Sequence, residues 1–506
     1  QIRLIAHAEH IPVHLGSMPI TVREALRRVK DFGEGDMIII NDPYSGGTHL
    51  PDITLIAPVF LDGELIGFVA NRAHHSDVGG KTPGSMPGDS TEIFEEGIII
   101  PPLKLVEKYE VREDILRIIL ANVRTPEIRR GDLMAQIAAN IRGIQRVRSL
   151  ASRYGVETYL NALEDILDYS ERLARRRITS LPEGSAEAED YLDDGGEMYP
   201  HPIAIRVIVK IKNGELTFDF TKSDPEVPAS VNAPRAVTVS ATYYTVKCLL
   251  GEDIPSNEGT YRPIKIITKK GTVVDATFPR AVAGGNVETS QRIVDTILLA
   301  LSKIVPEKIP AASQGTMNNV AFGGIDPNTG RPFTFYETIG GGFGARPNKD
   351  GVDGVHSHMT NTMNTPIEEI ERLYPIRILR YSLRVDSGGA GEWRGGLGIE
   401  RVYEILAPMR VSLLGDRQKF APWGLNGGFP GAKGEYILKR GGREIKLKSK
   451  TTIDLASGDI LIIRTPGGGG HGDPAERDKK RVILDILEGK ISKAYAKKYY
   501  GVKVNE

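Results

Sequence analysis

The sequence contains almost no cysteine, since Cys248 is the only thiol among 506 residues. One cysteine cannot form a disulfide within the chain, and it cannot supply a cysteine-rich zinc or iron–sulfur site. The absence of disulfides is no obstacle to stability, because a chain of this length can bury a large hydrophobic core. We therefore expect a protein of a reducing compartment, the cytoplasm.

Net charge and long apolar runs are missing as well. The 65 Lys and Arg residues balance the 65 Asp and Glu residues, so no overall field attracts a nucleic-acid backbone or an anionic membrane. No apolar stretch approaches the roughly 20 residues that span a bilayer, and the start lacks the pattern of a signal peptide. The composition argues against nucleic-acid binding and predicts a soluble protein. The abrupt start at Gln1 leads us to expect a preceding N-terminal piece.

The first third of the chain shows strand patterns followed by helical patterns. Residues 34–73 read as strands, and Asp62-Gly63 predicts a hairpin turn because both central positions of a type I′ turn need positive φ. From about residue 112 to 153 the apolar spacing becomes helical, with an expected break at Pro126. Another helix is expected at 156–173.

The remainder alternates in the same way. Asn213-Gly214 predicts a second hairpin, and the spacing predicts helices at 237–250 and 288–304. Strand patterns dominate from about 379 to 463, and Asp473 has the features of a cap for a helix that runs to about Gly489. These patterns together predict a multi-domain α+β fold with a β-rich C-terminal part.

The segment at 182–197 is rich in glycine and acidic residues and is the best linker candidate. We divide the chain there and at two later changes of pattern. The expected regions are an N-terminal metal-binding region at 1–181, a middle α+β region at 182–378, a β-rich region at 379–474 and a helical segment at 475–506.

Two polar motifs meet at one end of the first hairpin. His49-Leu-Pro-Asp52 precedes one strand, and His74 ends the next. A two-residue turn at 62–63 places Asp52 opposite residue 73, and a β-bulge would shift this pairing by one residue. In either register the three side chains start within several Å of one another, since opposed Cβ atoms lie roughly 5 Å apart.

Two imidazoles and a carboxylate are a common ligand set for a divalent transition metal, and this set suits zinc, manganese and iron alike. His49, Asp52 and His74 are therefore the candidate metal ligands. The alternative is that these polar residues only satisfy backbone groups around a glycine-rich turn. The neighbouring candidates for catalytic or ligand-orienting roles, since a carboxylate often orients a ligand imidazole, are Asp42, His75 and Asp77.

Further polar residues are candidates for substrate binding. Pro12 favours an extended segment, which would place His10 and His14 on one face; structural histidines are the alternative. Glu288 and Arg292 open a predicted helix whose N-terminus would favour an anion, although ordinary capping explains the same residues. The final candidates are His358 and Asn361. They would orient a carbonyl or carboxylate group of the substrate, and a purely structural role is the alternative.

Nucleotide-binding motifs are absent or incomplete. The sequence holds no Gly-x-x-x-x-Gly-Lys-Ser/Thr motif, so nothing indicates that this chain binds ATP phosphates by itself. Gly340, Gly342 and Ala345 satisfy a dinucleotide-binding spacing, but Arg346-Pro does not open the helix that such a fold requires. These glycines indicate turns, or a loop whose bare backbone approaches a substrate or partner.

Long strings along nearly the whole chain resemble the hydantoinase B family, a group that includes oxoprolinases and acetone carboxylases. They are Ala8-Glu-His-Ile-Pro-Val-His-Leu-Gly-Ser-Met18, Asn41-Asp-Pro-Tyr-Ser-Gly-Gly-Thr-His-Leu-Pro-Asp52, Arg72-Ala-His-His-Ser-Asp77, Pro83-Gly-Ser-Met-Pro87, Gly284-Gly-Asn-Val-Glu-Thr-Ser-Gln291, Gly340-Gly-Gly-Phe-Gly-Ala345, His358-Met-Thr-Asn-Thr362 and Gly467-Gly-Gly-Gly-His-Gly-Asp-Pro474. Several such strings together are far more specific than any one motif.

The resemblance implies a division of labour between subunits. A hydantoinase A type partner binds ATP and phosphorylates a carbonyl-derived oxygen, and the B-type subunit completes the reaction within a hetero-oligomer. Family members with a described metal site use a His-x-x-Asp and a later His, which correspond here to His49, Asp52 and His74. The family also carries an acidic residue ahead of the position of Gln1, and this chain as given lacks that segment.

The expected function is therefore the B-type subunit of an ATP-dependent hydrolase of a cyclic amide such as a hydantoin or 5-oxoproline. The resemblance leaves two alternatives open. The same site would serve a ketone carboxylase, although those subunits are longer than this chain, or the chain would be a non-catalytic subunit that shapes its partner's active site.

Overall fold

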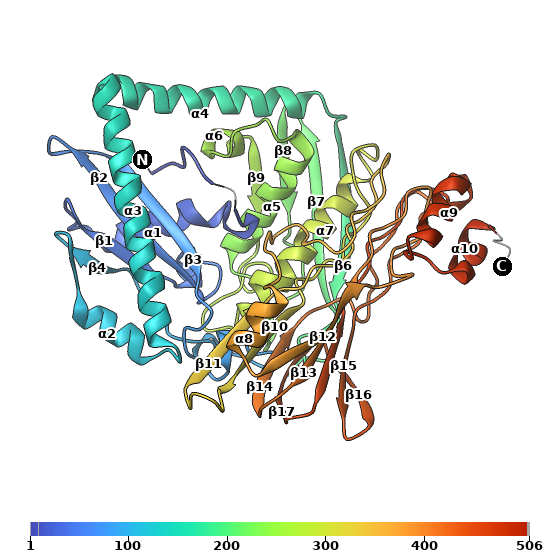
Figure 1. Cartoon of the computed structure of the whole chain (residues 1–506). Helices are drawn as coiled ribbons and strands as arrows, with labels where there is room; N and C mark the ends of the chain where they lie inside the picture. Colours follow the sequence, from blue (N-terminus) through green and yellow to red (C-terminus); the bar gives the residue numbers. More distant parts are fainter. Residues whose placement is uncertain (1, 9, 503–506) are drawn as a thin grey trace.

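The computed structural model describes residues 2–8 and 10–502, and it has a mixed α and β architecture with four sheets. The expected multi-domain α+β fold is confirmed. The N-terminal sheet lies at one side of the molecule, the β-rich part lies at the other, and helices of the middle part stand between them (Figure 1). Within the described residues, no helix is both long and apolar enough to cross a membrane.

The N-terminal sheet has the strand order β3-β2-β1-β4-β5. Apolar residues fill every position of β1 because helices cover both faces of this sheet. Ile38 and Ile40 pack with Val22 of helix α1 (Ser17–Arg28), while Ile39 belongs to the core shared with helix α3. The strands are β1 (Met37–Ile40), β2 (Asp52–Leu61), β3 (Glu64–His74), β4 (Leu103–Glu107) and β5 (Glu110–Val111).

The β2–β3 hairpin contains both the predicted turn and a β-bulge. Asp62 and Gly63 have φ of 51° and 82°, as a type I′ turn requires. The register shifts by one residue between Val59 and Phe60. The shifted register continues to the open end of the hairpin, where Asp52 pairs with His74. A turn alone would have placed Asp52 opposite residue 73, so the bulge decides which residue faces this carboxylate.

Three helices lead from this sheet to the middle of the molecule. Helix α2 (Glu113–Ala121) ends before Pro126, and that proline begins α3 (Pro126–Tyr154), so the predicted break is confirmed. Gly155 separates α3 from α4 (Val156–Thr179), which runs across the top of the molecule toward the second sheet (Figure 1).

The second sheet corrects the predicted linker. Residues 184–192 form strand β6, so the expectation of a linker at 182–197 is wrong for this stretch. Ala188, Asp190 and Leu192 alternate inward, and Asp190 is buried because it forms an ion pair with Arg417. The many acidic residues favour a linker by composition, although every second residue at the end of this segment points inward as in a strand. The strands of this sheet are β6 (Gly184–Leu192), β7 (Ile203–Lys212), β8 (Glu215–Asp219) and β9 (Ile264–Ile267).

Helices of the middle part bury one face of the second sheet. Helix α7 (Ser290–Leu301) contacts β6 and β7, and α5 (Arg235–Leu250) packs against α7. A π-helical turn, η5 (Gly285–Thr289), precedes α7. Gly285 is required there, because a Cβ atom at this position would lie 1.9 Å from the carbonyl oxygen of Asn232. The short helix α6 (Glu258–Tyr261) contacts α4.

Two further sheets form a sandwich, since Phe322, Tyr403 and Leu461 from both of them share one hydrophobic core. The strand-rich pattern after residue 379 is confirmed, although β10 and β11 precede it. One sheet contains β11 (Pro332–Glu337), β10 (Asn319–Ile325), β14 (Met409–Leu414) and β17 (Lys450–Leu455). The other contains β12 (Ile376–Leu383), β13 (Ile399–Ile405), β18 (Ile460–Arg464), β15 (Glu435–Arg440) and β16 (Arg443–Leu447), with α8 (Ile367–Leu373) against β12.

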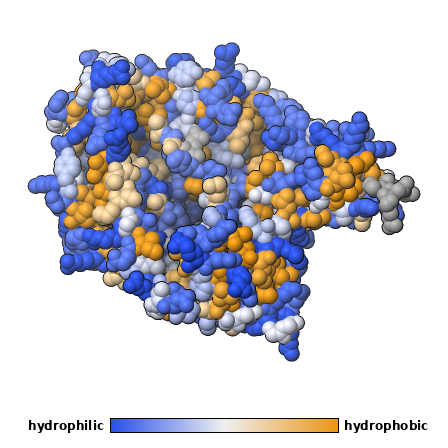
Figure 2. All heavy atoms as spheres, in the orientation of Figure 1, coloured by the Kyte–Doolittle hydropathy of each residue, from blue (hydrophilic) through white to orange (hydrophobic). Residues whose placement is uncertain are grey.

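The single C-terminal helix expected from 473 to 489 is divided. Residues 474–476 form a 3₁₀ turn, and helix α9 (Lys479–Leu487) begins only after Arg477 adopts an extended conformation. This lets its guanidinium pair with Asp350 and Asp485. Helix α10 (Lys493–Tyr500) follows, and both helices protrude at one end, where hydrophobic residues gather on the surface (Figures 1 and 2).

The hairpin geometry yields a stability prediction. Gly63→Ala places a side chain at φ 82° with no atom within 4 Å, so the expected cost of about 1 kcal/mol is purely conformational. Gly67→Ala in β3 is the matched control, because its site is equally open and its φ is not positive. Thermal unfolding should show a lower midpoint for Gly63→Ala and no decrease for Gly67→Ala. Equal midpoints would contradict the type I′ turn.

Candidate metal centre and the cavity that it faces

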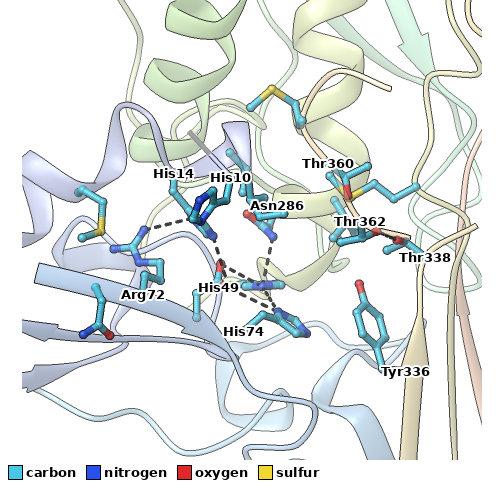
Figure 3. Close-up of a pocket in the computed structure, with 18 of the residues that line it drawn as sticks. His10, His14, His49, Arg72, His74, Asn286, Tyr336, Thr338, Thr360 and Thr362 are labelled. Carbon is cyan, nitrogen blue, oxygen red and sulfur yellow. Dashed lines mark hydrogen bonds and ion pairs between the residues drawn. The ribbon is translucent and has the colours of Figure 1, made fainter. Parts of the chain in front are cut away.

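Three side chains converge at the open end of the β2–β3 hairpin, and Figure 3 labels the two histidines among them. Asp52 begins β2, His74 ends β3 directly opposite, and His49 lies in the turn that leads into β2. His49 Nε2 lies 3.1 Å from Asp52 Oδ2 and 3.1 Å from His74 Nδ1. His74 Nδ1 lies 3.4 Å from Asp52 Oδ1, and one ligand atom from each residue lies within 4.8 Å of the others.

This spacing fits a metal ion. Ligand atoms that are about 2.0–2.2 Å from a metal lie roughly 3–3.5 Å from one another. His49 Nε2 also lies 3.2 Å from the amide nitrogen of Asn286, so three polar atoms surround one ring nitrogen. A neutral ring nitrogen offers either one proton or one lone pair and cannot serve three partners. A cation between the two imidazoles and the carboxylate removes the conflict among those three groups, because each of them binds a metal through a lone pair.

The surroundings of His49 and Asp52 favour the protonation states in which these groups bind a metal. His49 and Asp52 are each only 1% exposed. Burial lowers the pKa of His49 and keeps its imidazole neutral. Burial acts to raise the pKa of Asp52, but the adjacent His49 and His14 outweigh it, so this pKa lies well below its usual value. A neutral imidazole and a carboxylate are the forms that bind metal.

Neighbouring groups hold the three side chains in place. The hydroxyl of Thr48 donates to Asp52 Oδ2. The ring of Tyr336, at the end of β11, stacks on His74 with centroids 4.9 Å apart, and its hydroxyl donates to Asn319 Oδ1 at 2.7 Å. Groups from other parts of the chain therefore orient the ligands, as is common around metal sites.

The triad faces a cavity of about 630 Å³. Figure 3 shows hydroxyl groups of Thr338, Thr360 and Thr362 on the wall across from His74. Arg72 is the only Arg or Lys among the described lining residues. The cavity is lined by residues from the N-terminal ranges 6–8 and 10–18, which include η1 (Pro12–His14). The end of the hairpin, η5, residues 336–338 and the loop 359–365 complete it.

Two of the predicted substrate-binding residues line this cavity. His10 is exposed at its edge, and His14 is mostly buried with its Nε2 3.9 Å from Asp52 Oδ1. Burial lowers the pKa of His14 to about 3, so its ring is neutral. The amide of Asn361 donates to the carbonyl oxygen of His10 at 3.2 Å, which places Asn361 at the rim rather than inside.

The three predicted catalytic residues lie outside the cavity lining. Asp42 caps the turn η2 (Pro43–Ser45) through the backbone of Tyr44. His75 points to the opposite face of β3 from His74, and its Nε2 lies 2.9 Å from Gln136 Oε1 on α3. Asp77 accepts hydrogen bonds from the backbone and side chain of Arg124. These residues stabilise the hairpin's surroundings, and the catalytic assignment is not supported by their positions.

Glu288, Arg292 and His358 also lie outside the cavity lining, and all are buried. Arg292 does not receive an external anion, because carboxylates of the chain itself surround it. Its guanidinium lies 2.6 Å from Asp416, 3.2 Å from Asp295 and 3.4 Å from Asp190. His358 contacts the same Asp295 at 3.3 Å. Glu288 reaches the site only indirectly, by accepting from the Asn319 amide that neighbours Tyr336.

Arg72, Asn286 and Tyr336 are site residues that were not predicted from the sequence. Arg72 carries a usable signal, because it lies two residues before His74 on the same face of a strand. Asn286 follows Gly284-Gly285, but only the π-helical turn aims its amide at His49. Tyr336 reaches the site through packing of a distant sheet, which no local pattern reveals.

The chain is similar to several known proteins. The chain is 48% identical over 99% of its length to an uncharacterized protein of Methanocaldococcus jannaschii, of which it covers 88%. It is 35% identical over its full length to the B-type subunit of a putative D-/L-hydantoinase of a Pseudomonas species, again covering 88%. It is 42% identical over 93% of its length to 5-oxoprolinase 1 of Arabidopsis thaliana, but spans only 38% of that protein.

Solved structures share the whole fold. An ATP-dependent caprolactamase from Pseudomonas jessenii superposes with a TM-score of 0.93 at 29% identity, covering 99% of this chain and 89% of that one. A nucleotide-free acetone carboxylase gives a TM-score of 0.92 at 20% identity, covering 99% and 74%. The model of the family described as hydantoinase B/oxoprolinase matches residues 1–474. The chain therefore belongs to the hydantoinase B/oxoprolinase family.

Proposed function

We propose that this chain is the metal-binding component of an ATP-dependent hydrolase that opens a cyclic amide. The observation that carries the proposal is the convergence of His49, Asp52 and His74 on a cavity of about 630 Å³. Related proteins named as 5-oxoprolinase, hydantoinase and caprolactamase support this reaction class, since each name refers to a cyclic amide or to its hydrolysis.

We assign ATP binding to a hydantoinase A type partner or to another part of the complete protein. Two observations support this division. The chain has no Walker-type phosphate-binding motif. It also corresponds to only 38% of the plant 5-oxoprolinase, so most of that enzyme has no counterpart here. With a separate partner, the assembly is a hetero-oligomer in which the partner phosphorylates the amide oxygen and this chain completes hydrolysis.

In this proposal the two imidazoles and the carboxylate hold zinc, manganese or iron. When bound, such a metal supplies Lewis acidity, which polarises a carbonyl oxygen and makes water a better nucleophile near pH 7. Thr48 and Tyr336 keep Asp52 and His74 in place. Across the cavity from the metal ligands, the hydroxyls of Thr338, Thr360 and Thr362 bind the polar edge of the cyclic amide substrate.

The first prediction concerns the metal itself. The purified protein should contain about one divalent ion per chain, and His49→Ala and His74→Ala should each reduce this to about one tenth, because each removes a ligand. Elemental analysis by mass spectrometry measures the content directly. His201→Ala is the matched control, since His201 is exposed and does not line the cavity, and it should retain the metal. A metal-free native protein would contradict the proposed centre.

The second prediction concerns the reaction. With its ATP-binding partner, the protein should hydrolyse 5-oxoproline, a hydantoin or caprolactam at the expense of ATP. Loss of a metal ligand in His74→Ala should lower ring opening by at least about 100-fold. Product formation is measured by chromatography alongside ATP consumption, with His201→Ala again as the control.

The same assembled protein, supplied with acetone and labelled bicarbonate as well as the cyclic amides, distinguishes the rival reactions. Incorporation of labelled bicarbonate into acetone, without ring opening, would replace the hydrolase by a carboxylase. Unchanged turnover in a metal-free His74→Ala protein would move the chemistry to the partner and leave this chain a structural subunit.

A further inference from the structure

The guanidinium of Arg72 lies half-buried beside the candidate metal centre, where it makes four hydrogen-bonding contacts. Nε donates to Thr54 Oγ1 at 2.8 Å, and one terminal nitrogen donates to Thr21 Oγ1 at 2.8 Å. The other terminal nitrogen donates to the hydroxyl of Ser17 and lies 3.4 Å from Nδ1 of His14. None of these four partners is a carboxylate; they are three hydroxyls and one imidazole nitrogen.

The contact with Arg72 decides where the proton of His14 resides. A guanidinium has only donors and stays protonated, so His14 Nδ1 must accept and must carry its lone pair. A neutral ring with a free Nδ1 has its proton on Nε2. Protonation of Nδ1 instead would set two N–H groups against each other.

The protonated nitrogen of His14 faces the reaction site. His14 Nε2 lies 3.9 Å from Asp52 Oδ1, which is beyond hydrogen-bonding distance and leaves this N–H available to the cavity that His14 lines. Figure 3 shows the ring of His14 between Arg72 on one side and His49 and His74 on the other.

We propose that Arg72 holds His14 as the neutral Nε2–H tautomer, and that this N–H donates a hydrogen bond to an oxygen atom of the substrate next to the triad. The inference rests on the proposed function. His14 is then a hydrogen-bond donor to a carbonyl or phosphoryl oxygen and does not act as a general base. A fixed donor stabilises an oxygen most as that oxygen gains negative charge, so the contact acts chiefly on kcat. Arg72 is a positioning residue.

The first test does not depend on activity. Two-bond ¹H–¹⁵N correlation spectra of the full-length, metal-free protein labelled with ¹⁵N-histidine report the tautomer of each ring, and the signal absent from His14→Gln identifies His14. We expect the Nε2–H pattern in the native protein and a mixture of tautomers in Arg72→Met. Arg27→Met, which removes an exposed arginine of α1, should leave the pattern unchanged. An Nδ1–H or imidazolium pattern in the native protein overturns the proposal.

The second test compares two amides in the assembled, metal-loaded enzyme. The side-chain nitrogen of Gln reaches the position of Nε2, whereas that of Asn reaches only that of Nδ1. His14→Asn should lower kcat by about 100-fold, as loss of one such donor does, with little change in KM. His14→Gln should retain kcat within about tenfold of the native enzyme. Equal inactivation of both variants, each with its metal retained, indicates a base and overturns the donor role.

These measurements separate failure of this inference from failure of the proposed function. If no cyclic amide is hydrolysed, the spectra of the metal-free protein still decide the tautomer. If hydrolysis is found but His14 has the wrong tautomer, only the role of His14 and Arg72 falls.

Discussion

The opposed pairing of Asp52 with His74 is the constraint on which the site depends. A hairpin fixes which residues face each other, and a change of one residue moves a side chain to the other face of the sheet. The bulge near the turn therefore acts over the length of the hairpin. It brings His74 beside the carboxylate and leaves His75 facing α3, where it contacts Gln136.

Burial of Asp52 makes a bound cation favourable at this pair. Asp52 is a nearly inaccessible carboxylate whose hydrogen-bond partners are the hydroxyl of Thr48 and the neighbouring imidazoles. A buried charge of this kind is costly unless a counter-charge offsets it. Burial lowers the pKa of His49, so its neutral imidazole does not provide that charge, whereas a divalent cation does. Arg72 adds a second, half-buried positive charge nearby, so a metal-loaded cavity favours substrates that become negative during reaction.

A buried cluster of ion pairs connects helix α7, strand β6 and the loop between β14 and β15. Arg292 of α7, Asp190 of β6 and Arg417 of the β14–β15 loop contact one another directly or through Asp295 and Asp416. Replacing either arginine by a neutral residue leaves buried aspartates without their counter-charge, and a loss of this kind costs about 3–5 kcal/mol. The cluster fixes α7 and with it the π-helical turn that carries Asn286 to His49.

Local patterns were enough to predict the hairpins at 62–63 and 213–214, the helix break at Pro126 and the three metal-ligand candidates. These features depend on backbone preferences and on spacings of a few residues, which the sequence contains directly. The tertiary structure decided the register at Asp52, and it showed that Arg292 is surrounded by the chain's own aspartates. It also brought Tyr336 and Asn286 to the ligands. The register depends on a β-bulge that no local pattern marks. The other outcomes depend on packing between segments more than a hundred residues apart, where burial and partner charges override the character of a residue in isolation.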